Sequence, residues 1–188
     1  YLDRNKDSSA LKYFVEPVFY SINHLKNTRK FNEISLVGIS GGARTIDLVS
    51  AIDERPQNAF SIAGPLPLEL GNFIYCNGNF YTNIIPHNSK HYEYYNEELP
   101  NIISEYDQYI LSSYSPTNIR TYHQIRLSHE FQHHYCDDKY KLYETLIKNR
   151  LSKLENGNFY VKKLTAYKHF IPKEAENYII QFLKNKTQ

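Results

Sequence analysis

The sequence predicts an α/β domain in which helices flank a mostly parallel β-sheet. Short β-rich runs alternate with amphipathic helical patterns along the chain, and this alternation is typical of parallel sheets. The length of 188 residues fits one domain with a modest insertion. A hydrophobic content of 41% is enough for one core. We therefore expect residues 1–188 to form a single α/β domain.

Four elements are expected in the first half of the chain, each marked by its hydrophobic period. They are, in order, a helix over 9–26, a strand over 34–38, a helix over 43–53 and a strand over 59–63. Pro17 lies inside the first helical pattern, which predicts a kink at this residue or a helix that starts near Glu16. Pro56 stops the second helix, and Gly64 closes the second strand.

Residues 66–120 differ from the rest because Gly, Pro, Tyr and Asn interrupt any long hydrophobic period. We expect an irregular, lid-like insertion there, with one helix around 102–113. After it the pattern is regular again, with a strand over 123–131, a helix over 140–154, a strand over 159–164 and a helix over 175–183. Asn156-Gly157 is predicted to end the helix over 140–154 as its C-cap.

The charge balance and the cysteine count exclude several classes of protein. Lys and Arg total 22 against 20 Asp and Glu, a net charge of +2, which is too balanced for a dedicated nucleic-acid binder. No run of about 18 apolar residues is present, so no transmembrane helix is expected. Cys76 and Cys136 are too few for a disulfide framework. The compartment and the oligomeric state stay open.

One motif carries chemistry. Gly38-Ile39-Ser40-Gly41-Gly42 fits the pattern G-x-S-x-G, with a predicted strand before it and a predicted helix after it. A serine on such a strained turn projects its hydroxyl above the sheet, and we expect the flanking positions to require glycine. The backbone N–H of Gly41, at the helix start, is suited to hold an oxyanion. The pattern predicts Ser40 as a nucleophile, and the alternative is a glycine-rich turn that binds phosphate or only packs tightly.

A serine nucleophile needs a base, and the chain order of such sites predicts where it lies. The histidine is expected after the last strand. His169 follows the strand over 159–164 and precedes the final helix, and no other histidine follows that strand. We therefore expect His169 to act as the general base.

These motifs resemble a known family over roughly residues 11–70. The stretches that carry the resemblance are Phe14-Val15-Glu16-Pro17-Val18, Gly38-Ile39-Ser40-Gly41-Gly42 and Ala63-Gly64-Pro65-Leu66-Pro67. They resemble the α/β-hydrolase superfamily, in particular a group of uncharacterised bacterial members. The resemblance implies serine hydrolase chemistry at the carboxyl ends of the strands. It also implies that the strands before the first helix, with the loop giving a second oxyanion donor, are missing, and the chain starts at Tyr1 with no methionine. We expect a fragment.

The acid of the triad is the point at which the sequence departs from this family. The resemblance implies an Asp after the strand over 123–131, but the residue at that place is Gln132. An amide cannot compensate the charge of an imidazolium. Asp137 and Asp138 lie in the following loop, and Glu130 is a further carboxylate nearby. Asp137 is our predicted acid, against the alternative that the Asp pair caps the next helix.

A rival motif follows the strand pattern. His129-Glu130-Phe131-Gln132-His133 fits H-E-x-x-H, in which two histidines on one helix face bind zinc and the glutamate polarises the bound water. His134, Cys136, Asp137 and Asp138 are potential third ligands. No second motif supports this zinc metallopeptidase reading, so it remains the alternative.

The sequence as a whole favours a serine hydrolase that acts on an ester-type or amide bond of a small molecule, through Ser40, His169 and Asp137. No cofactor and no metal are expected. Gln132 keeps a second alternative open, a hydrolase-like binding protein without catalysis.

Overall fold

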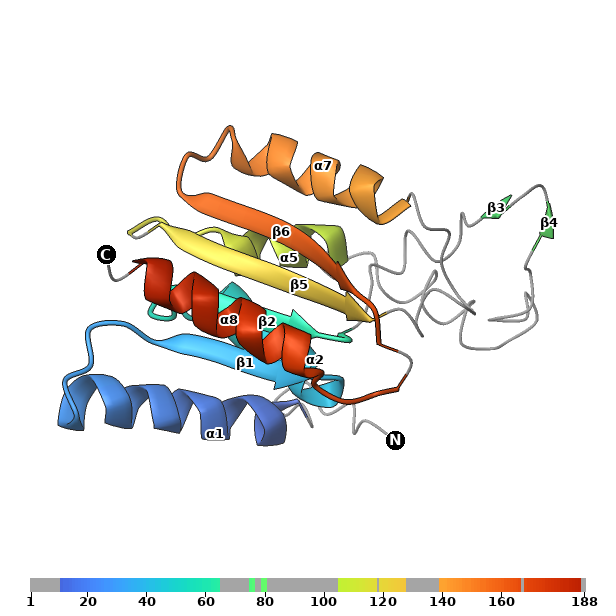
Figure 1. Cartoon of the computed structure of the whole chain (residues 1–188). Coiled ribbons are helices and arrows are strands. Elements are labelled where there is room, and N and C mark those ends of the chain that lie inside the picture. The colour runs from blue at the N-terminus through green and yellow to red at the C-terminus, as the bar shows by residue number, and fades with distance from the viewer. Residues whose placement is uncertain are drawn as a thin grey trace.

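A parallel sheet between two layers of helices makes up the described part of the chain (Figure 1). The computed structural model describes residues 11–64, 75–76, 79–80, 105–117, 119–127, 139–166 and 168–186. Strands alternate with helices along these ranges. The α/β class predicted from the sequence is therefore confirmed.

The sheet is four-stranded and runs in the order β1-β2-β5-β6, with every neighbouring pair parallel. Its strands are β1 (Ser35–Ile39), β2 (Asn58–Ile62), β5 (Arg120–Leu127) and β6 (Gly157–Leu164). Because all four run in one direction, their carboxyl ends meet at one edge, which is where open α/β sheets bind ligands. Two short strands, β3 (Tyr75–Cys76) and β4 (Asn79–Phe80), form a separate antiparallel pair.

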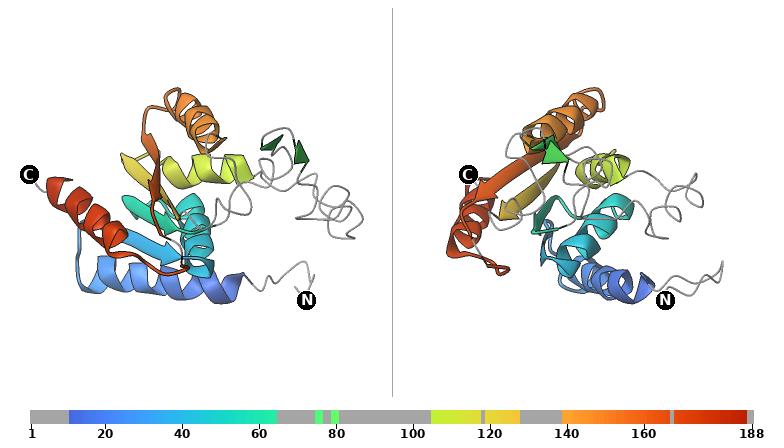
Figure 2. Two further views of the ribbon diagram at one scale, coloured as in Figure 1. Left: turned by 45° about the vertical axis from the view of Figure 1, so that its right-hand side comes forward. Right: turned by 90° about the vertical axis from the view of Figure 1, so that its right-hand side faces the viewer.

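The helices cover both faces of the sheet, as the two views in Figure 2 show. One face carries α8 (Lys173–Lys186). The other face carries α1 (Lys12–Asn23), α2 (Gly41–Ile52), α5 (Glu105–Ser113) and α7 (Lys139–Leu151). Strands of such a sheet are rich in apolar residues, and the runs 34–38 and 59–63 show this composition.

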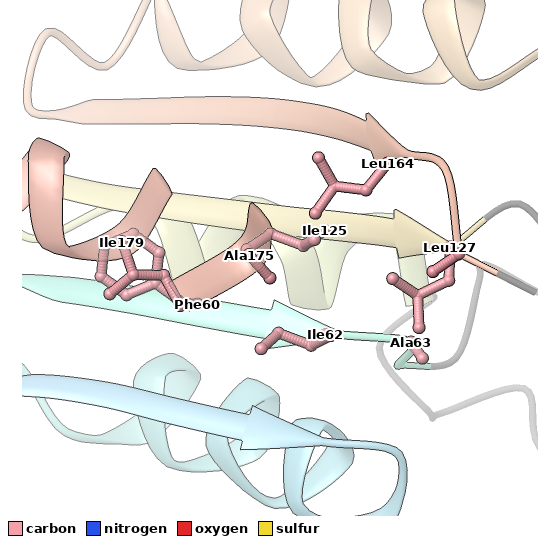
Figure 3. Packing of buried hydrophobic residues seen from close by; sticks show 9 residues of the cluster. Phe60, Ile62, Ala63, Ile125, Leu127, Leu164, Ala175 and Ile179 are labelled. Atoms are coloured by element: carbon pink, nitrogen blue, oxygen red, sulfur yellow. The ribbon is translucent and has the colours of Figure 1, made fainter. Parts of the chain in front are cut away.

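Figure 3 shows the hydrophobic core between the sheet and α8, which is aliphatic apart from Phe60. It is built by side chains of three strands and of α8, namely Phe60, Ile62, Ala63, Ile125, Leu127, Leu164, Ala166, Ala175 and Ile179. All of them are buried. Alternate residues of each strand point to this face, as the period of two requires.

Two clusters fill the opposite face. The first joins α1, β1 and α2 through Val15, Ile22, Ile34, Leu36, Ile46 and Val49. The second joins α5, α7 and the strands β2, β5 and β6 through Ala59, Tyr109, Ile110, Tyr122, Ile147, Leu151 and Phe159. Helix α5 confirms the helix expected around 102–113, and it packs into the core although it lies within the range 66–120 expected to form a lid-like insertion.

The first helix differs from the prediction. Helix α1 begins at Lys12 and runs through Pro17, so the expected start near Glu16 is wrong. Its chain continues as a π-helical turn, η1 (His24–Thr28). Proline lacks the N–H that would bond one turn back, and the burial of Val15 and Ile22 on α2 and β1 offsets this loss.

The boundaries of two other elements also differ from the prediction. Strand β5 begins at Arg120, three residues before the predicted start at His123, and the predicted end at Phe131 lies outside the described residues. Helix α7 ends at Leu151, so the expected C-cap at Asn156-Gly157 is wrong. Gly157 is instead the first residue of β6, where an added Cβ would lie 2.7 Å from the Ser113 carbonyl oxygen.

Strand β1 lies at one side of the sheet. It pairs with β2, and within the described ranges no strand pairs with its other side. Val37 on the α8-facing side of β1 is 46% exposed, because α8 covers the strands beyond β1. None of the helices in the described part of the chain is long and apolar enough to cross a membrane.

Candidate active site

Ser40 forms the turn between β1 and α2, with φ 54° and ψ −117°. A left-handed backbone costs a non-glycine residue energy on the order of 1–3 kcal/mol, and such residues cluster at functional sites. The Ser40 N–H donates to the Ile62 carbonyl oxygen at 2.9 Å, and its carbonyl oxygen accepts the Arg44 N–H at 3.0 Å. Ser40 itself is exposed at the carboxyl edge of the sheet.

The glycine requirement is confirmed on one side of Ser40 only. A Cβ on Gly38 would lie 2.5 Å from the carbonyl carbon of Gly42 and 2.9 Å from the Ala43 nitrogen. A Cβ on Gly42, in contrast, would meet no atom within 4 Å. The expectation that both flanking positions need glycine is therefore wrong for Gly42, because the close approach is between the Gly38 Cα and the Gly42 backbone.

The start of α2 offers backbone donors beside Ser40. The Arg44 N–H makes the first bond of the helix, to the Ser40 carbonyl oxygen, so the amides of Gly41 and Gly42 precede the intrahelical ladder. The helix dipole also favours negative charge at this end. This arrangement suits an anionic oxygen beside Ser40.

His169 lies in the connection between β6 and α8 and is exposed. Its strand β6 and the Ser40 strand β1 lie at opposite sides of the described sheet. Because all four strands are parallel, the connection that follows β6 and carries His169 starts at the carboxyl edge of the sheet, the edge at which Ser40 follows β1.

The remaining predicted site residues lie outside the described residues. These are the acid candidates Asp137, Asp138 and Glu130, with Gln132, and the zinc motif residues His129 and His133. Within the described part of the chain, no group of three or more His, Cys, Asp or Glu side chains is placed to hold a metal ion.

A buried polar layer behind Ser40 was missed by the sequence reading. Asp47 of α2, Ser61 of β2, and Tyr122 and Arg126 of β5 are all buried. The Tyr122 hydroxyl donates to Asp47 Oδ1, and Arg126 Nη1 donates to the Gly64 carbonyl oxygen at 2.6 Å. The sequence contained a signal for this layer, because Asp47 lies within the apolar period of a predicted helix and Arg126 lies within a predicted strand.

Burial dominates the electrostatics of this layer. It raises the pKa of the Asp47 carboxyl from its usual 3.8 to about 7, although the hydroxyl of Tyr122 and the charge of Arg126 favour the ionised form. Burial also raises the pKa of the Tyr122 hydroxyl well above its usual range, and the Asp47 carboxyl adds to the effect. The Tyr122 hydroxyl therefore keeps its proton and serves as a donor.

Comparisons with known proteins show similarity at the level of the fold. No family model matches the sequence, and no curated protein matches it significantly. A solved acylaminoacyl peptidase in complex with Z-Gly-Gly-Phe-chloromethyl ketone matches 91% of this chain and 27% of its own, with TM-score 0.54 and 13% identity. A solved esterase from Pyrococcus furiosus matches 95% of this chain and 64% of its own, with TM-score 0.54 and 14% identity.

Both neighbours are α/β-hydrolases, and this chain has the α/β-hydrolase fold. The resemblance drawn from the three sequence motifs is thus confirmed at the level of the fold. The chain spans less than two thirds of either solved chain.

Proposed function

We propose that this chain carries the nucleophile of a serine hydrolase that cleaves ester-type bonds. The observation that carries the proposal is the backbone of Ser40, which is left-handed at a strand-to-helix turn and exposed at the carboxyl edge of the sheet. A serine that only filled a turn would not need this strained conformation. Strain of this kind is typical of a serine whose hydroxyl must project from the sheet.

The proposed reaction proceeds through an acyl-enzyme. Ser40 Oγ attacks the substrate carbonyl carbon while His169 accepts the hydroxyl proton. The negative charge that develops on the carbonyl oxygen is stabilised by the Gly41 N–H at the start of α2. His169 then gives the proton to the leaving alcohol, and water attacks the acyl-enzyme in the reverse sequence of proton transfers, releasing the acid and Ser40.

The third member of the triad and the substrate pocket belong to the same proposal. Asp137 is proposed to accept the second ring N–H of His169 and to stabilise its imidazolium form. The part of the expected insertion 66–120 that precedes α5 is proposed to shape the substrate pocket as a lid, since α5 itself packs into the core. The neighbours support a hydrolase by their fold and their names, since one is an esterase and the other a peptidase.

Hydrolysis of p-nitrophenyl esters tests this function. Ser40→Ala should lower turnover by about 10⁴–10⁶-fold, as loss of such a nucleophile does. Ser152→Ala is the matched control, because Ser152 is exposed after α7 and its hydroxyl donates to a carbonyl oxygen of the same helix end, that of Asn149, at 3.0 Å. Turnover of the Ser152→Ala control should equal that of the wild type. A metal chelator should leave the turnover of the wild type unchanged. Retained activity in folded Ser40→Ala would refute the proposal.

A further inference from the structure

Two residues beside each other at the site have a left-handed backbone although neither is glycine. They are Ser40, with φ 54°, and Ala63, with φ 48°. The two are coupled, because the Ser40 N–H donates to the carbonyl oxygen of Ile62, the residue before Ala63, at 2.9 Å. An alanine gains nothing from this conformation by itself. The contacts around Ala63 must therefore hold it there.

Strand β5 supplies such contacts from two consecutive residues. The Ile125 carbonyl oxygen accepts the Ala63 N–H at 2.9 Å, and Arg126 Nη1 donates to the Gly64 carbonyl oxygen at 2.6 Å. Arg126 is only 2% exposed. A charge-assisted hydrogen bond that is shielded from water is strong and directional, so Arg126 fixes the carbonyl group of Gly64, the residue after Ala63.

The turn at Gly64 lies directly against the helix that carries the site. A Cβ on Gly64 would lie 3.0 Å from the Ala43 Cβ and 2.5 Å from Ser61 Oγ. Ala43 belongs to the first turn of α2, next to the Gly41 amide. Because no space separates the two segments, a shift of the Gly64 turn would displace the start of α2 and Ser40 with it.

Arg126 is also linked to α2 through charge. A buried guanidinium is costly unless a partner compensates it, and the charge of Arg126 acts on the Asp47 carboxyl, two turns after Ser40 in α2. The Tyr122 hydroxyl binds the same carboxyl from β5. The two β5 side chains thus tie α2 and the end of β2 to the centre of the sheet.

We propose that Arg126 is a positioning residue of the serine hydrolase: through Gly64 and Ala63 it holds the Ser40 turn in its left-handed conformation. This inference rests on the proposed function of Ser40. It adds a role for a residue that does not touch the substrate and that lies behind the catalytic serine.

Arg126→Lys tests the role, because lysine keeps the charge and loses the rigid fork of the guanidinium. We expect the rate constant for acylation of Ser40 by a p-nitrophenyl ester to fall by about 10- to 100-fold, as a displacement of about 1 Å can cause. The KM should change by less than about threefold. Adding Ala63→Gly to Arg126→Lys should restore most of the rate, because glycine adopts a positive φ without strain.

Arg120→Lys is the matched control. Arg120 is a second buried arginine on the same face of β5, at the opposite end of the strand, where its guanidinium donates to the carbonyl oxygens of Ser50 and Asp53. Its replacement should lower the free energy of unfolding and leave the acylation rate constant of the folded enzyme unchanged. The comparison therefore separates positioning from general stability.

Three results would overturn the role of Arg126: an unchanged acylation rate constant in folded Arg126→Lys, an equal loss in Arg120→Lys, or a loss that Ala63→Gly does not reduce. If Arg126→Lys does not fold, recovery of both folding and acylation in the double variant supports the role, because Ala63→Gly then replaces what Arg126 supplies. A double variant that stays unfolded, or that folds but is acylated more than about threefold more slowly than Ala63→Gly alone, overturns it. Wild-type turnover that survives Ser40→Ala would instead refute the proposed function.

Discussion

The Cα of Gly38 in β1 faces the backbone of Gly42 in α2 so closely that a Cβ on Gly38 would lie 2.5 Å from the Gly42 carbonyl carbon. The strand before Ser40 and the helix after it are packed backbone against backbone. The tight turn at Ser40 depends on this contact, because a side chain at Gly38 would push the start of α2 away from the sheet.

The two glycines should respond differently to alanine. Gly38→Ala should lower the free energy of unfolding by about 1–3 kcal/mol or more, the usual cost of overpacking, and should also lower ester turnover. Gly42→Ala should be neutral or stabilising by up to about 1 kcal/mol, because its Cβ meets open space within a helix. Urea unfolding of both variants checks this, and equal destabilisation would show that the contact at Gly38 is not the constraint.

Asp47 should make the fold less stable as the pH rises from about 4 to 7. The folded state raises the pKa of this carboxyl from 3.8 to about 7, so the folded protein binds the proton more tightly than the unfolded chain in this range. The loss is on the order of 4 kcal/mol across the range. Asp47→Asn should remove this component from a series of urea unfolding curves at pH 4 to 8. Parallel pH profiles of variant and wild type would contradict the buried carboxyl.

His123 should have the opposite effect on the acid side. Its ring is buried against Phe60, with the centroids 4.6 Å apart, and its Nδ1 lies 2.8 Å from the Tyr178 hydroxyl. Burial, helped by the charge of Lys186, lowers the pKa of His123 from 6.5 to about 3. The unfolded chain therefore binds this proton first, and stability falls as the pH drops from 6.5 toward 3.

His123→Phe is the test of this effect, because phenylalanine keeps an aromatic ring in the stack and cannot be protonated. Between pH 7.5 and pH 4.5 the wild type should lose about 3 kcal/mol that the variant keeps. The comparison is of pH dependence, so a constant offset from imperfect packing does not affect it. If both proteins lose the same stability on acidification, His123 is not the responsible group.

The elements that were predicted well are those with a local signal. Strands 34–38 and 59–63 are short runs rich in apolar residues and bounded by turn signals, and the final helix buries a regular apolar stripe that includes Ala175 and Ile179. Strand β5 was placed too late because the face toward α2 carries Arg120, Tyr122 and Arg126. Those side chains are buried by partners from distant segments, which the hydrophobic period cannot reveal.

The residues of the candidate site can also be separated into those with a local sequence signal and those without one. Ser40 could be proposed from sequence because its signal is contained in five consecutive residues, and His169 could be proposed because chain order predicts its place. The polar layer of Asp47, Tyr122 and Arg126 was missed, since each residue is unremarkable without its partner across the fold. An acid supplied by a loop depends on how that loop folds back, and the sequence pattern does not contain this information.

The acid assignment predicts a graded series of variants. Asp137→Asn should lower ester turnover by about 10⁴-fold, as an amide in the acid position does in a related triad. Asp138→Asn should have a smaller effect, and Gln132→Ala should change little. Steady-state kinetics of the three variants decides among them. Three variants with wild-type turnover would show that His169 works without Asp137, either in a dyad with Ser40 or with Glu130.

Covalent labelling by a fluorophosphonate tests the central claim most directly, because this reagent phosphonylates an activated serine and leaves an ordinary one unmodified. We predict one adduct per chain by intact mass, mapped by peptide sequencing to Ser40. Labelling should be absent in Ser40→Ala and unchanged in Ser152→Ala. A folded wild-type protein that takes up no label, or that is labelled equally well in Ser40→Ala, would contradict the assignment of Ser40 as the nucleophile.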